Sequence, residues 1–110
     1  MNTMPNTNRW EPERVVMRRE YDPFMEIEKV LVVFPDDRAN LGRLCYVVMW
    51  FDGNGTAWFE PYGECSYSYY LSLKPLKDVE MVEKCKAALE ERYGGKFKIM
   101  QKIMKLNWRR

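Results

Sequence analysis

The sequence contains no histidine among its 110 residues. Histidine is the commonest general base at neutral pH, and it completes Ser–His and Cys–His dyads and mixed Cys/His zinc sites. Its absence removes most familiar hydrolase mechanisms. We therefore expect a protein that is not an enzyme, with no catalytic residue, no cofactor and no metal.

Cysteines and long apolar runs are also scarce. Cys45, Cys65 and Cys85 form an odd, widely spaced set without a CxxC pair, which favours free thiols in the core over a disulfide framework. No apolar run approaches the roughly 18 to 20 residues of a membrane span, and the N-terminus lacks the basic-then-apolar order of a signal peptide. We expect a cytoplasmic protein that does not contact the membrane.

The sequence also lacks a convincing ligand motif. Asp36, Asp37 and Asp52 lie in loops or turns, whereas hard cations need several converging oxygens. Gly53-x-Gly55 precedes an apolar run and fits no Walker or dinucleotide pattern. These residues are interpreted as solvated loop acids and as hairpin glycines.

The composition is that of one globular domain. With 46% hydrophobic and 31% charged residues, the chain has enough material for a single core and enough charge for solubility. Residues 1–12 are rich in Asn, Thr and Pro, and we expect them to form a mobile arm. The domain is predicted to span 13–104, and 105–110 are predicted to form a basic tail.

The middle of the chain predicts adjacent strands. Residues 13–21 are compatible with a short strand, and residues 26–34 become wholly apolar from Val30, as in the central strand of a sheet. Residues 44–51 and 56–60 flank the sequence Asp-Gly-Asn-Gly and predict a hairpin. Asp-Gly and Asn-Gly both favour type I′ turns, so either pair could form the turn.

The second half predicts another strand, a helix and a last strand. Residues 65–73 alternate with period two, which favours a strand over a short helix. Asp78 is a suitable cap for a helix over about 79–93, which Gly94-Gly95 would end. Residues 96–103 alternate again. The fold class is therefore α+β: a small, mainly antiparallel sheet of four to five strands, with the helix packed on one face.

Eight aromatic residues fall between Trp50 and Tyr70, more than one face of a small sheet can bury. Exposed aromatic residues are enriched in protein interfaces, and they also form the platforms on which single-stranded nucleic acids stack. The candidate interface residues are Trp58, Tyr62, Tyr67, Tyr69 and Tyr70.

The charge is unevenly distributed. Residues 96–110 contain six Lys/Arg and no acid, so residues 1–95, with 12 basic and 16 acidic residues, sum to −4. Basic residues interleaved with apolar ones favour, as an alternative function, binding of single-stranded nucleic acid. The residues that would contact it are Lys96, Lys98, Lys102, Lys105, Trp108, Arg109 and Arg110.

One segment resembles a known pattern. Residues 32–46 contain an apolar strand that ends in Phe-Pro, followed by Ala, Asn and Gly and by a strand with a Tyr. The matching residues are Phe34, Pro35, Ala39, Asn40, Gly42 and Tyr46. The segment resembles small uncharacterised proteins of bacterial phages and mobile elements. The resemblance implies a mobile-element origin, where small non-enzymatic proteins that bind and block host machinery are common.

We therefore expect a non-enzymatic protein-binding module, such as a phage or mobile-element inhibitor of a bacterial host defence protein. Its partner would be a bacterial protein or a second copy of the same chain. Binding of single-stranded nucleic acid is the alternative.

Overall fold

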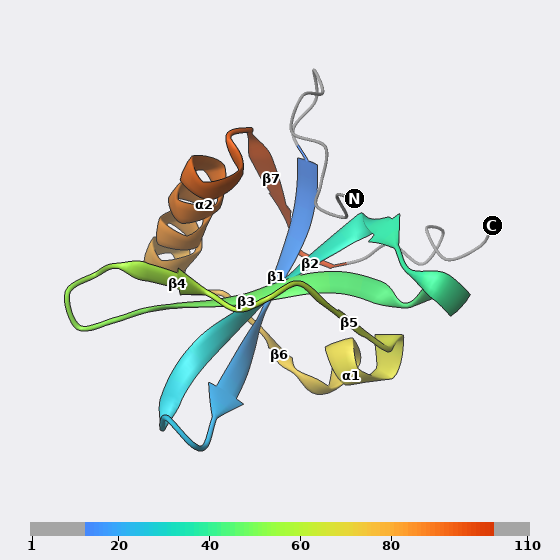
Figure 1. Cartoon of the computed structure of the whole chain (residues 1–110), viewed down its shortest axis with the longest axis horizontal. Coiled ribbons are helices and arrows are strands. Elements are labelled where there is room, and N and C mark those ends of the chain that lie inside the picture. Colours follow the sequence, from blue (N-terminus) through green and yellow to red (C-terminus); the bar gives the residue numbers. More distant parts are fainter. Residues whose placement is uncertain (1–12, 103–110) are drawn as a thin grey trace.

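A computed structural model describes residues 13–102, and the predicted arm over 1–12 and tail over 105–110 lie outside the described residues (Figure 1). The strands follow the path β4-β3-β2-β1-β6, while β5 pairs with β3 and β7 pairs with β1. The sheet is mostly antiparallel and curled, which confirms the α+β class. The elements are β1 (Glu13–Asp22), β2 (Ile27–Arg38), a 3-10 turn (Asn40–Gly42), β3 (Leu44–Phe51), β4 (Ala57–Phe59), β5 (Gly63–Cys65), α1 (Tyr67–Ser72), β6 (Lys74–Pro75), α2 (Val79–Tyr93) and β7 (Phe97–Met100).

The sheet carries a core on each of its two faces. Side chains of successive strand residues point to opposite faces, so Val30 and Val32 join one cluster while Leu31 and Val33 join the other. Helix α2 covers the first cluster and α1 the second; Figure 1 shows α2 above and α1 below β3. Burial on both faces explains why β2 becomes continuously apolar.

Helix α2 has the predicted limits. The Asp78 side chain accepts hydrogen bonds from the backbone N–H groups of Glu80 and Met81, and Gly94 ends the helix with φ 78°. Cys85 and Leu89 are fully buried, as their helical spacing predicts. Val79, in the first turn of the helix, is 75% exposed.

Residues 67–72 form a helix, so the strand predicted over 65–73 is wrong beyond Cys65. The Ser66 hydroxyl caps the helix by accepting a hydrogen bond from Tyr69 N, and Tyr67 and Tyr70 stack one turn apart with ring centroids at 5.8 Å. The residues that pack on the sheet are Tyr67, Tyr70 and Leu73, with helical spacing. The alternation of Ser and Tyr in this segment gave a period of two, and this is why the helical spacing of Tyr67, Tyr70 and Leu73 was not recognised.

All four residues from Asp52 to Gly55 form the β3–β4 turn, and the turn is not of type I′. Gly55 N donates to Asp52 O at 3.0 Å, and of the two glycines only Gly55 has positive φ, at 81°. A type I′ turn on either Asp52-Gly53 or Asn54-Gly55 would need positive φ at both of its residues, and neither Asp52 nor Asn54 has it. The loop instead matches a tight turn followed by a left-handed glycine, which is the bulged hairpin connection.

The last strand lies at the other side of the sheet from this hairpin. β7 pairs in parallel with β1 from Glu13↔Phe97 to Val16↔Met100, and β2 separates β1 from β3. Among residues 13–102 there is no helix with the length and apolar character that crossing a bilayer requires.

Candidate protein-binding surface

The five aromatic residues predicted for an interface have different environments. Trp58 and Tyr69 are exposed, at 51% and 39%, whereas Tyr62 and Tyr67 are half-buried. Tyr70 is 1% exposed and belongs to the core under α1. Tyr70 is therefore withdrawn from the candidate interface, because its ring is already covered by the sheet.

The two exposed members of this set are held in place by hydrogen bonds. Trp58 stacks on Trp50 across the β3–β4 pair, and its indole Nε1–H donates to Asp52 Oδ2 at 2.8 Å. The Tyr69 hydroxyl donates to Glu20 on β1. Partial burial, together with this carboxylate, raises the pKa of Tyr69, so its hydroxyl stays protonated.

Much of the aromatic surplus is used in packing. Tyr62 stacks on Phe34 with ring centroids 6.1 Å apart. The pKa of Tyr62 is raised, mainly by burial and secondly by the neighbouring Cys45 thiol. Two long cations cover further rings: Lys84 Nζ lies 4.7 Å from the Phe51 ring centroid, and the guanidinium carbon of Arg92 lies 4.5 Å from that of Phe59. The sequence-based expectation considered burial on one face of the sheet, whereas both faces carry a core and cations cover further rings.

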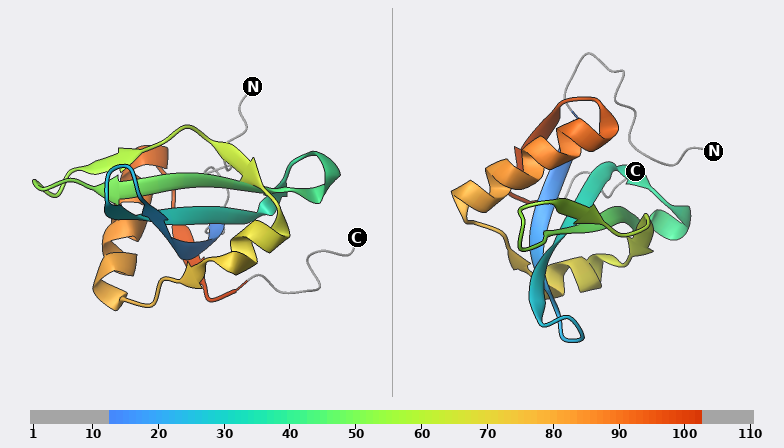
Figure 2. Two further views of the ribbon diagram at one scale, coloured as in Figure 1. Left: turned by 90° about the horizontal axis from the view of Figure 1, so that it is seen from below. Right: turned by 60° about the vertical axis from the view of Figure 1, so that its left-hand side comes forward.

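The tip of the β1–β2 hairpin exposes apolar side chains that the sequence analysis did not select. Phe24 is 96% exposed, Tyr21 55% and Met25 50%. Figure 1 and the right-hand view of Figure 2 show this hairpin extending beyond both helices. We call Tyr21, Phe24 and Met25 the hairpin tip. The available signal was an apolar pair, Phe24 and Met25, directly after Pro23 within the turn, where the chain would normally be polar.

The turn that presents these residues is well defined. Asp22 Oδ1 accepts hydrogen bonds from Phe24 N at 2.8 Å and Met25 N at 3.2 Å, while Glu26 N donates to Asp22 O at 2.7 Å. Glu26 closes the turn with φ 58°. The backbone under Phe24 is thus fixed before any partner arrives, which reduces the entropy lost on binding.

Lys29 ties the hairpin to the rest of the sheet. Its side chain is 5% exposed, and Nζ lies 2.7 Å from Asp22 Oδ2, 2.6 Å from Glu60 Oε2 and 4.1 Å from the Trp50 ring centroid. Burial alone would lower the pKa of Lys29, but the hydrogen bonds to the two carboxylates outweigh it and raise that pKa. The Lys29 hydrogen bond also lowers the pKa of Asp22. Lys29 is therefore a charged structural link.

The cysteines considered for chemistry are buried, and Asp36 is engaged in an ion pair. Cys45, Cys65 and Cys85 are free and buried, as predicted, and burial raises the pKa of Cys65 to about 11 and that of Cys85 to about 12. Asp36 pairs with Arg14, whose Nε lies 2.9 Å from Oδ2. Residues 13–102 contain no group of three or more Cys, Asp or Glu side chains arranged to hold a metal ion.

The three lysines of the nucleic-acid alternative that lie within residues 13–102 are not beside the aromatic hairpin. Lys96, Lys98 and Lys102 are exposed, on or next to a strand that pairs with β1 and lies away from β3 and β4. The remaining members of that set, Lys105, Trp108, Arg109 and Arg110, lie outside the described residues.

Comparisons with known proteins give no relative: no family model matches the chain, and neither a curated protein nor a solved structure does. The geometry of the described residues therefore carries the functional argument.

Proposed function

We propose that this chain is a non-enzymatic protein-binding module that contacts its partner through the hairpin tip. The observation that carries the proposal is Phe24, whose side chain is 96% exposed on a turn fixed by Asp22. Burial of the phenyl ring by a partner would contribute a favourable free energy of about 25 cal/mol for each Å² of apolar surface removed from water. Aromatic residues and Met are also the types enriched at the centres of protein interfaces.

Two further features support a protein partner. Tyr21 and Met25, close to Phe24 in the chain, are also exposed, so the tip offers more apolar surface than a single ring. The resemblance of residues 32–46 to small phage and mobile-element proteins makes a bacterial host protein the first partner to test. A phage or mobile-element inhibitor of host defence is the narrower form of the proposal, and self-association is the other.

The test is affinity capture from bacterial lysate with the full chain, comparing wild type with Phe24→Ser. Loss of an anchoring aromatic side chain should weaken binding by at least about 2 kcal/mol, or roughly 30-fold. Sedimentation of the isolated chain, with and without the substitution, detects self-association through the same surface.

Leu41→Ser is the matched control. Leu41 is 99% exposed but lies in the Asn40–Gly42 turn beyond the other end of β2. A captured protein lost with Phe24→Ser and kept with Leu41→Ser supports the proposal. Equal capture by both variants and by wild type would show that the hairpin tip is not the contact surface.

A further inference from the structure

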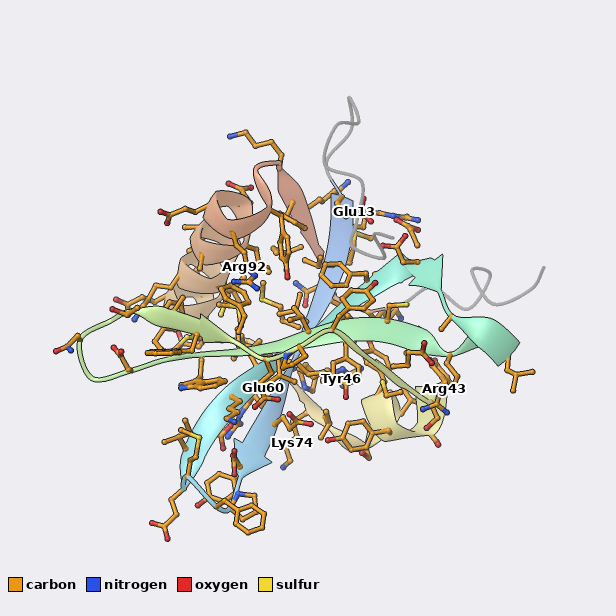
Figure 3. The ribbon with its side chains drawn as sticks, viewed as in Figure 1. Glu13, Arg43, Tyr46, Glu60, Lys74 and Arg92 are labelled. Carbon is orange, nitrogen blue, oxygen red and sulfur yellow. The ribbon has the colours of Figure 1, made fainter. Side chains whose placement is uncertain are left out.

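A groove runs along the end of the sheet that α2 leaves uncovered. One hollow of about 630 Å³ lies between the sheet and the segment Lys74–Met81, and a second of about 240 Å³ lies between β1 and the end of α1. Arg19, Glu28 and Lys74 line both hollows, so the two are immediate neighbours. We call them together the basic groove. Figure 3 shows Lys74 beside the lower half of β1.

The groove exists because the strands are longer than the helix that covers them. Val15 and Met17 of β1 are buried under α2, but Arg19 and Tyr21 continue the same face of the strand beyond the first turn of α2. The pairing of β6 with β1 also stops at Arg19, although β1 continues to Asp22. This end of the sheet therefore presents both an open face and an open strand edge.

The charge of the groove is positive. Lys74 and Lys77 are exposed, and no acid within residues 13–102 forms an ion pair with either. Arg19 is balanced by Glu28, with Nε 3.5 Å from Oε1. Lys29 is neutralised by its two carboxylates, and Asp78 is engaged in capping α2. Within the described part of the chain, Lys74 and Lys77 therefore remain without an acidic partner on the rim.

The floor of the larger hollow is apolar. Val30 and Phe51 form the sheet side, while Leu76 and Met81 form the opposite wall. Phe51, Leu76 and Met81 are only partly buried, so a side chain that entered the hollow would cover apolar surface. The smaller hollow extends the groove along the β1 edge, which suits an elongated segment better than a compact small molecule.

We propose that the basic groove binds an acidic peptide segment that seats one large apolar side chain against Phe51 and Met81. This inference rests on the proposed protein-binding function and specifies the chemistry of the partner. Carboxylates of the segment would pair with Lys74 and Lys77. Its backbone would run along the open edge of β1, where a strand can be added to a sheet.

Selection from a random peptide library against the full chain tests this inference. The enriched peptides should be net acidic and contain at least one large aliphatic or aromatic residue. Their affinity, measured by fluorescence anisotropy, should fall about tenfold or more for Lys74→Glu/Lys77→Glu, because attraction becomes repulsion, and the difference should shrink at high salt.

The matched control is Lys96→Glu/Lys98→Glu, which reverses two exposed lysines at β7. Binding by this variant should stay within about twofold of wild type. Absence of any enriched peptide, enrichment of neutral or basic peptides, or equal binding to both double variants would overturn the proposal. So would displacement of the peptides by a dT oligonucleotide that itself binds more tightly, which would assign the groove to nucleic acid.

The outcome is separable from that of the hairpin-tip experiment. If capture depends on Phe24 but no acidic peptide binds, the groove inference fails and the proposed function stands. If acidic peptides require Lys74 and Lys77 while no lysate protein depends on Phe24, the groove inference stands and the hairpin tip is not the contact surface.

Discussion

At position 63, packing against Tyr46 leaves no room for a side chain larger than the hydrogen atom of glycine. Gly63 pairs with Tyr46 across β3 and β5, and a Cβ built on Gly63 would lie 2.8 Å from Tyr46 Cζ and 2.9 Å from its hydroxyl oxygen. The Tyr46 ring therefore lies directly over the glycine backbone. Desolvation in this position raises the pKa of Tyr46.

Gly63→Ala should lower the free energy of unfolding by about 1 to 3 kcal/mol, because the Tyr46 ring must move to admit the methyl group. Urea denaturation measures the change. Gly53→Ala is the control, because nothing lies within 4 Å of its added methyl group and its φ is not positive. An equal effect of the two substitutions would show that the contact with Tyr46 is not the cause.

Asp22 is expected to make stability depend on acid pH. Its pKa lies below the ordinary value of 3.8, first because of the Lys29 hydrogen bond and then because of Met25 N–H. A lowered pKa adds stability that is present above about 3.8 and is lost as pH falls through the folded-state value. The substitution Asp22→Asn keeps an oxygen acceptor for the turn but removes the charge. The difference in free energy of unfolding between wild type and this variant should be largest at neutral pH and should shrink below pH 3.8. A difference that is constant from pH 7 to 2 would contradict the role assigned to Lys29 and Asp22.

At the scale of elements, Ser66 caps the N-terminus of α1. The prediction of a strand over 65–73 did not consider this capping residue. Ser66 Oγ accepts a hydrogen bond from Tyr69 N at 3.1 Å. Ser66→Ala should cost about 0.5 to 2 kcal/mol in the free energy of unfolding, and Ser66→Asp, which can also cap, should cost less. Urea midpoints measure both. Equal losses would mean that the cap does not stabilise α1.

The elements predicted correctly are those whose signals are local and redundant. Asp78 and Gly94-Gly95 limit α2 on both sides of an apolar stripe, and the apolar run from Val30 identifies a strand buried on both faces.

Residues 67–72 were mispredicted because six residues are too few to separate a period of two from a period near three when Ser and Tyr alternate. The exposure of Phe24 could not be inferred, since it depends on where the hairpin projects. The basic groove joins β1, β2, β3 and the Lys74–Met81 segment, which only the tertiary structure brings together.

At the scale of the whole molecule, one three-stranded unit, β1 to β3, supplies residues to both cores. Cys85 lies in the cluster under α2 and Cys65 in the cluster under α1, and both thiols are buried. Their pKa values are raised by burial to about 12 and about 11, so almost no reactive thiolate is present in the folded state near pH 8. The two thiols therefore report separately on the two faces of the sheet.

Because β1 to β3 are shared, we predict that the two cores unfold together. Leu89→Ala removes a fully buried side chain on the α2 side and should cost about 2 to 5 kcal/mol. If the faces are coupled, the variant should shift the urea midpoint for alkylation of Cys65, on the α1 side, by the same amount as that for Cys85. Mass spectrometry after a brief alkylation pulse resolves the two sites. A variant in which Cys85 becomes reactive at lower urea while Cys65 keeps its wild-type midpoint would show that the faces unfold independently, and that the central strands survive the loss of α2.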